Sequence, residues 1–268
     1  MSGYDWGRDE VPLDRPSASR IYDYYLGGYH NFGIDRQIGD MMLAIAPDLR
    51  LGSLINRAFL QRAIRMMVEQ GIDQFLDLGS GIPTVGNVHE AARALNPEAR
   101  VGYVDIDPVA VTHGNAILAG DDRATIIRAD ICDTEGILTH ATVEALIDFD
   151  RPLGLLLVAI LPFVVDDEEA ERVVRTCGNM LAPGSYMAIS HSAAEAEIPG
   201  VEKLEELFGQ ASATVARSTS QVARYFDGFD LLEPGLVPTP QWRPDGPDDL
   251  LVSEPDRVYF VAGVGRKP

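Results

Sequence analysis

The sequence predicts an α/β fold in which a doubly wound, mostly parallel sheet carries helices on both faces. From residue 71 onward, short apolar runs alternate with helical segments, and this alternation builds βαβ units. Near the end, the strand-like runs FDLL and DRVYFVAGV follow each other without a long helix between them. We therefore expect an antiparallel hairpin at one edge of the sheet. With 268 residues, 46% of them hydrophobic, the chain can bury a full core.

The pattern before residue 71 is helical and predicts an N-terminal extension. Ser17 or Ser19 can cap a helix that runs through Leu26, where two glycines end it. Two further helical stretches run from Asp35 towards Ala46 and over residues 49–69. We expect residues 1–70 to pack on the core as a helical extension or lid. Residues 71–268 then form the ligand-binding domain.

The second part of the chain contains five apolar runs, each followed by helical segments. In order, the runs are DQFLDLG, RVGYVDID, ATIIRAD, PLGLLLVAI and SYMAISH, and helices are expected from Asn87, Pro108, Asp167 and Val201 after the first, second, fourth and fifth runs.

The composition excludes several classes of partner. The formal net charge is −19, from 41 acidic and 22 basic residues, so the surface repels nucleic acids and anionic membranes on average. The start of the chain has no signal-peptide pattern, and no apolar run is long enough to span a bilayer. Two cysteines, Cys132 and Cys177, have no metal-ligand spacing. We expect a cytoplasmic protein with a small-molecule partner and no metal. The sequence does not indicate the oligomeric state.

A glycine-containing turn follows the first strand. The run Asp77-Leu78-Gly79-Ser80-Gly81 lets the backbone turn sharply and approach a ligand. Its spacing differs from the G-x-G-x-x-G of dinucleotide-binding folds. The carboxylate of Asp77 would repel a pyrophosphate but could pair with a cationic amino group.

Acidic residues also end the second and third strands. Asp105 lies 24 positions after Gly81, which suits hydrogen bonding to a ribose diol. Asp107 precedes Pro108 and is better interpreted as a helix cap. At the next strand end, Asp130 could accept a hydrogen bond from an adenine amine, and Ile131 could supply an apolar wall. Each residue alone fits a turn, but successive strand ends bring such residues to one edge of a sheet.

Six segments, spread from about Arg15 to Gly263, resemble one protein family. They are RPSASRIYDYYLGGYHNFGIDR, NRAFLQRAIR, FLDLGSGIPTVGNVHE, YVDIDP, LLLVAILPFV and FDGFDLLEPGLVP. The sequence resembles the actinobacterial S-adenosyl methyltransferase family, formerly a domain of unknown function, within the class I S-adenosylmethionine-dependent methyltransferases.

The resemblance implies a Rossmann-like sheet of seven strands and S-adenosylmethionine as cofactor, with S-adenosylhomocysteine as product. The cofactor-binding residues that we expect are Asp77, Gly79, Ser80, Gly81, Asp105, Ile106, Asp130, Ile131 and Ala159. The chain departs from the general class at Pro83, where a third glycine is common. It also lacks the Asp/Asn-Pro-Pro-aromatic motif of nucleobase amino methyltransferases and the Pro-Cys nucleophile of cytosine C5 enzymes.

Aromatic residues crowd the N-terminal segment around its two glycines. We expect Tyr22, Tyr25, Asn31 and Phe32 to close over the cofactor and line part of the acceptor pocket. In the alternative interpretation, Tyr22 and Tyr25 are core residues on one face of a helix.

Methyl transfer needs a general base only for some acceptors, because the cofactor carries an activated leaving group. His30 and His191 are the candidates, since histidine titrates near neutrality. A structural or surface role for each is the alternative.

Together these observations predict a methyltransferase that acts on an unidentified, small-molecule acceptor. One alternative is a non-catalytic protein that binds S-adenosylmethionine or S-adenosylhomocysteine and regulates a partner. Another is a nicotinamide-dependent oxidoreductase, against which the glycine spacing and Asp77 argue.

Overall fold

The computed structural model describes residues 14–83, 86–196, 198, 200–246, 249 and 251–268. In these residues, eight strands form one sheet in the order β3-β2-β1-β4-β5-β8-β6, and β7 pairs with β8 outside this path. The strands are β1 (Gln74–Leu78), β2 (Arg100–Asp105), β3 (Ala124–Arg128), β4 (Gly154–Val158), β5 (Tyr186–Ser192), β6 (Asp230–Leu231), β7 (Val237–Pro238) and β8 (Phe260–Arg266).

The sheet confirms the predicted fold class. Strands β1 to β5 are parallel, whereas β8 runs antiparallel to β5, β6 and β7. The predicted edge hairpin is present, with Asp230 of β6 opposite Arg266 of β8. The expected count of seven strands is exceeded by β7, which is only two residues long and ends in Pro238.

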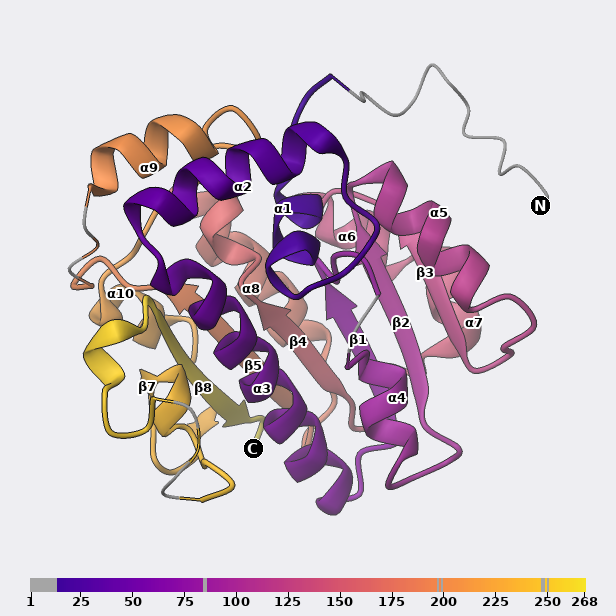
Figure 1. Cartoon of the computed structure of the whole chain (residues 1–268). Helices are drawn as coiled ribbons and strands as arrows, with labels where there is room; N and C mark the ends of the chain where they lie inside the picture. Colours follow the sequence, from indigo (N-terminus) through magenta and orange to yellow (C-terminus); the bar gives the residue numbers. More distant parts are fainter. Residues whose placement is uncertain (1–13, 84–85, 197, 199, 247–248, 250) are drawn as a thin grey trace.

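Helices cover both faces of the sheet (Figure 1). The α-helices are α1 (Ala18–Tyr25), α2 (Gly33–Ile45), α3 (Asp48–Glu69), α4 (Val88–Arg93), α5 (Pro108–Ile117), α6 (Thr134–Leu138), α7 (Ala141–Leu146), α8 (Asp167–Met180), α9 (Val201–Phe208) and α10 (Thr219–Arg224). Three short 3₁₀ helices are η1 (Leu161–Phe163), η2 (Thr239–Gln241) and η3 (Pro255–Arg257).

Two buried apolar clusters hold the layers together. One joins α3 and α4 to one face of the sheet, with Phe59 and Phe75 fully buried. The other joins α6, α7, α8 and α10 to the opposite face, with Leu155 and Val173 at its centre. In Figure 1, α3 and α4 lie in front of the strands and α8 lies behind them. The central strands read as continuous apolar runs because both of their faces are covered.

The N-terminal helices sit over the carboxyl end of the sheet. Helix α1 ends where expected, and Gly27 follows it with φ +82°. Helix α2 begins two residues earlier than expected, because the Asp35 carboxylate accepts from the backbone N–H of Phe32 at 2.8 Å. Leu204 and Leu207 of α9 pack with Met42 of α2 in a third apolar cluster.

Among the described residues, no helix has the length and the apolar character that crossing a membrane requires.

Candidate functional site

A cavity of about 560 Å³ opens at the carboxyl ends of the parallel strands. It lies where the strand order reverses between β1 and β4, the place where open α/β sheets bind ligands. Its volume falls in the range of small-molecule sites. We call it the switch-point cavity. Eleven of the predicted site residues line it: Tyr22, Tyr25, Asp77, Gly79, Ser80, Gly81, Asp105, Ile106, Asp130, Ile131 and Ala159.

The glycine turn after β1 has a conformation that favours glycine. Gly79 and Gly81 have φ of +75° and +66°, in the left-handed region. A Cβ on Gly79 would collide with the side chain of Ile160, whereas a Cβ on Gly81 would meet nothing within 4 Å. The backbone N–H groups of Gly79 and Ser80 donate to the carbonyl of Val104 at 2.8 and 3.1 Å. The turn is therefore fastened to β2 and leaves Gly81 open to the cavity.

Two carboxylates are buried beside this turn. Asp77 and Asp105 are 4% and 5% exposed. Desolvation raises the pKa of Asp77 to about 7 and that of Asp105 to about 6. The oxygens of Asp105 accept from the N–H of Gly81 at 2.7 Å and of Asp107 at 2.8 Å. Asp105 thus shapes the turn while it faces the cavity.

The neighbouring residues at the ends of β2 and β3 also match the sequence prediction. Asp107 caps α5 by accepting from the N–H of Val109 at 2.7 Å. Ile106 is 59% exposed although it is large and apolar, and Ile131 is buried. Asp130 accepts from the N–H of Cys132 at 2.9 Å. Two isoleucines and an acidic residue therefore meet at one end of the cavity.

Ala159, directly after β4, has a strained backbone. Its φ is +57°, which is uncommon for a residue with a side chain. Its N–H donates to the carbonyl of Ser190 at 3.1 Å, and it lines the cavity. Such strain often accompanies functional sites.

The sequence interpretation missed Arg57, which lies on α3 and lines the cavity. Its guanidinium carbon is 5.8 Å from the centre of the Tyr22 ring. Its positive charge lowers the pKa values of Asp77 and Tyr22, in part opposing the effect of burial. Its Nε is buried and has no hydrogen-bond partner among the described residues. Arg57 is thus a cation with unused hydrogen-bonding capacity at the cavity wall.

A signal for Arg57 was present in its neighbour. Asn56 is 1% exposed on α3, where it donates to the Tyr22 hydroxyl at 3.1 Å and accepts from the Ser190 hydroxyl at 2.6 Å. A polar Asn-Arg pair within an apolar helix face indicates that this part of the helix meets a polar site.

The structure does not bring His191 into the cavity wall. The side chain is fully buried, and burial lowers the pKa of its imidazole to about 4. One ring nitrogen, Nδ1, is 2.8 Å from the Ser192 carbonyl, and Nε2 is 3.1 Å from Nη1 of Arg217. Since both ring nitrogens are engaged, His191 fits a structural role rather than that of a general base.

Three other predicted residues also lie outside the cavity wall. The ring of His30 packs on that of His113, with centroids 3.9 Å apart. Asn31 is buried and donates to the carboxylate of Asp23 at 2.8 Å. Phe32 lies 5.0 Å from the guanidinium carbon of Arg20. These residues build the turn between α1 and α2, and the expected acceptor-pocket or lid residues reduce to Tyr22 and Tyr25.

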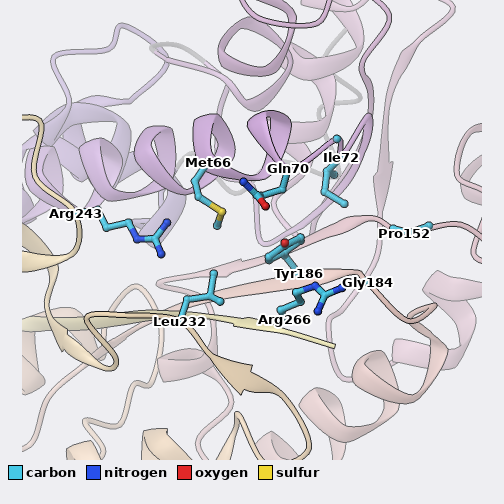
Figure 2. Close-up of a pocket in the computed structure, with 10 residues that line it drawn as sticks. Met66, Gln70, Ile72, Pro152, Gly184, Tyr186, Leu232, Arg243 and Arg266 are labelled. Atoms are coloured by element: carbon cyan, nitrogen blue, oxygen red, sulfur yellow. The ribbon is translucent and has the colours of Figure 1, made fainter. Parts of the chain in front are cut away.

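A second cavity, of about 620 Å³, lies at the opposite end of the parallel strands. Figure 2 shows Met66 and Gln70 of α3 above Tyr186, Arg266 and Leu232. Its wall includes residues that directly precede β1, β4 and β5, so it opens at the amino ends of these strands. None of the predicted site residues lines it. The switch-point cavity is therefore the candidate active site.

In the described part of the chain, no group of three histidine, cysteine or acidic residues is arranged to hold a metal ion.

Comparisons with known proteins identify the family. A family model described as S-adenosyl methyltransferase matches residues 4–268. A Thermobifida fusca protein proposed to be a methyltransferase is 40% identical, with a TM-score of 0.90, over 98% of this chain and 99% of its own. A DUF574 family protein from Streptomyces avermitilis is 33% identical, with a TM-score of 0.89, over 96% of this chain and 99% of its own. No match is found among curated proteins.

Proposed function

Because the chain belongs to the S-adenosyl methyltransferase family, whose cofactor is S-adenosylmethionine, we propose that it methylates a small-molecule acceptor in the switch-point cavity. The observation that carries this proposal is the convergence of Asp77, the glycine turn, Asp105 and Asp130 on one cavity. The net charge of −19 favours a small molecule over a nucleic acid as the acceptor.

The residues at the strand ends fit the parts of the cofactor. Asp105 would accept hydrogen bonds from the ribose hydroxyls, and Asp130 would accept from the adenine amine. Ile106, whose side chain is 59% exposed, would pack on one face of the adenine with Ile131 nearby. Burial of this exposed isoleucine contributes to binding through the hydrophobic effect.

The methionine end of the cofactor carries an ammonium and a carboxylate, and the cavity offers one group of opposite charge for each. Asp77 would pair with the ammonium, and Arg57 would donate to the carboxylate. This pairing would offset two unfavourable features of the ligand-free protein. The Asp77 carboxylate is desolvated, and the buried Nε of Arg57 has no hydrogen-bond partner among the described residues. Charged groups in such sites are stabilised when they are paired and hydrogen-bonded.

When bound, S-adenosylmethionine supplies an electrophilic methyl group on a sulfonium whose neutral thioether is the leaving group. The protein then has to align the acceptor with this group and exclude water. The glycine turn and the strained backbone at Ala159 fix the floor of the cavity between β1 and β4.

We also propose that residues 1–70 act as an extension that closes over the cofactor and adds Arg57 to the binding residues of the domain formed by residues 71–268. The hydroxyl of Ser17 donates to Asp107 beside the ribose-binding strand end, and Tyr22 lines the cavity. Deletion of residues 1–34 should weaken the affinity for S-adenosylhomocysteine in a variant that still melts cooperatively. Unchanged affinity would remove the lid role.

Calorimetry with two ligands tests the cofactor site. S-adenosylhomocysteine has the amino-acid end, whereas 5′-methylthioadenosine lacks it. We expect Arg57→Met to weaken S-adenosylhomocysteine by about 1.5–3 kcal/mol, the value of a hydrogen bond to a charged group, and to leave 5′-methylthioadenosine unchanged. Asp105→Ala should weaken both ligands by about 1–3 kcal/mol.

Arg65→Met is the matched control, because Arg65 lies on the same helix but pairs with Asp245 at the surface. If Arg57→Met weakens both ligands equally, the carboxylate assignment is wrong. If neither ligand binds the wild-type protein, the cofactor site as a whole is wrong.

The family contradicts the nicotinamide-dependent alternative. No finding favours the non-catalytic alternative, and transfer of a radioactive methyl group to any acceptor would dismiss it.

A further inference from the structure

The switch-point cavity extends beyond the part that we assign to the cofactor. Apart from Ala159, which follows β4, the predicted cofactor residues lie at the ends of β1, β2 and β3, whereas a second part of the wall lies over β4, β5 and β8. We call this second part the acceptor chamber and define it by Phe163, Val201, Leu204, Phe208, Tyr259 and Phe260. It begins where the strand order reverses, next to the place of the transferable methyl group.

Helix α9 gives the chamber an apolar side. Val201, Leu204, Glu205 and Phe208 line the cavity, and their spacing of three, four and seven residues puts them on one face of the helix. Val201 at its start is 43% exposed, whereas Leu204 is buried against α1 and α2, so this face is open at one end and packed in its middle. In Figure 1, α9 lies beside α2 over the carboxyl end of the sheet.

Aromatic rings from η1, α9 and the start of β8 also line the chamber. The rings of Phe163 and Phe208 have centroids 6.0 Å apart and an interplanar angle of 36°. Both side chains are half-buried, as is Phe260, while Tyr259 is 6% exposed. Half-buried rings that line a cavity can pack on a further aromatic ring in offset or edge-to-face contact.

The chamber has little charge. None of the six residues that define it is charged, and the charged residues nearest to it on the described cavity wall are Glu205 of α9 and Arg57 of α3, the latter assigned above to the cofactor. An acceptor with a carboxylate or a phosphate would be desolvated there without a cationic partner, which is costly.

We propose that the acceptor chamber binds a neutral, planar aromatic molecule whose hydroxyl or amine faces the switch point. This inference rests on the proposed methyl transfer. A lone pair of the acceptor oxygen or nitrogen forms the bond to the methyl carbon as the carbon–sulfur bond breaks, its electron pair stays on sulfur, and the acceptor proton passes to water. Neither His30 nor His191 lines the cavity, so the acceptor proton has to leave directly to water.

Two ligands with the same ring system test the chamber. We would titrate 2-naphthol and 2-naphthoate into the wild-type protein saturated with S-adenosylhomocysteine and follow binding by calorimetry. We expect 2-naphthol to bind and 2-naphthoate to bind at least about tenfold more weakly, because its carboxylate finds no partner.

Variants locate the bound ring. Phe163→Leu and Phe208→Leu keep the apolar character but remove the ring, and each should weaken 2-naphthol about three- to tenfold. Tyr29→Leu is the control, since Tyr29 is 94% exposed outside the cavity and should have no effect. Melting curves show whether each variant is folded. Glu205→Arg should improve binding of 2-naphthoate.

The inference is overturned if 2-naphthol does not bind, if 2-naphthoate binds equally well, or if both phenylalanine variants behave like Tyr29→Leu. Binding of S-adenosylhomocysteine is measured first and separately. Its absence would sink the proposed function, whereas the two naphthalene ligands, titrated without cofactor, would still decide the nature of the chamber.

Discussion

The buried carboxylate of Asp77 should make the ligand-free protein less stable at neutral pH than at acidic pH. Desolvation raises its pKa from 3.8 to about 7. The folded state therefore favours the protonated form. This contribution to stability is fully present below pH 4 and is lost as the pH rises through about 7. Asp77→Asn removes the titrating group while it keeps the shape of the side chain.

The size of the effect follows from the shift. A rise of about three pKa units corresponds to about 4 kcal/mol of differential stability, which is an upper value because nearby Arg57 and Asp105 also respond. The free energy of unfolding of Asp77→Asn, relative to wild type, should therefore rise by about 2–4 kcal/mol between pH 4 and pH 8. At pH 8, where the wild-type carboxylate is ionised, the variant should bind S-adenosylhomocysteine more weakly than wild type, because its amide does not pair with the ammonium.

Urea denaturation of both proteins at intervals between pH 4 and pH 8 gives the difference between their free energies of unfolding. The contributions of the other titrating groups are shared by both proteins and cancel in this difference. Asp122→Asn serves as the control, because Asp122 is 92% exposed outside the cavity. If the free energies of unfolding of wild type and Asp77→Asn stay parallel across this range, Asp77 does not change its ionisation there. The argument that burial raises its pKa is then refuted.

Two further predictions concern stability measured by urea denaturation. Gly79→Ala should lower the free energy of unfolding by about 2–4 kcal/mol, because a left-handed φ and a collision with Ile160 act together. Gly81→Ala should lower it by only about 1–2 kcal/mol and mainly weaken cofactor binding. Equal losses for the two variants would contradict the geometry. Arg62 is 6% exposed and donates to the carbonyls of Trp242 and Thr239 at 2.9 and 2.8 Å. Its replacement by Met should cost about 2–4 kcal/mol, and a loss below about 0.5 kcal/mol would show that water replaces these bonds.

The convergence of the acidic strand-end residues on one cavity could be predicted because topology fixes it. Parallel strands bring their carboxyl ends to one edge, so Asp77, Asp105 and Asp130 had to converge once the alternation of strands and helices was recognised. The Asp-Pro sequence similarly predicted the cap at Asp107, and the structure confirms it. These predictions depend on local patterns and on general rules of chain connection.

His191 shows where such reasoning stops. Successive side chains of a strand point to opposite faces. Ser190 bonds to Asn56 on the side of α3, and Ser192 lines the cavity. His191 lies between them and meets Arg217 instead. The sequence prediction put His191 just beyond the strand, whereas β5 continues through Ser192 and directs the imidazole to the other face of the sheet.

The N-terminal segment could be divided into helices but not placed. Each helix has an apolar face, and nothing in the sequence states which part of the sheet it covers. Tyr22 and Tyr25 reach the cavity through α1, whereas Asn31 and Phe32 stabilise the following turn. Arg57 was missed for the same reason, since its place depends on how α3 crosses the sheet.

These differences explain why the sequence indicates the cofactor more readily than the acceptor. Residues assigned to the cofactor follow β1, β2 and β3, whose positions the parallel sheet determines. The acceptor chamber is built instead from Phe163 of η1, from α9 and from residues at the start of the antiparallel strand β8. These elements lie outside the alternating pattern, and packing of α9 against α1 and α2 fixes the helix in place. A substitution in α9 can therefore change which acceptor binds without disturbing the sheet or the glycine turn. Acceptor specificity thus depends on tertiary packing and cannot be predicted from a local sequence motif.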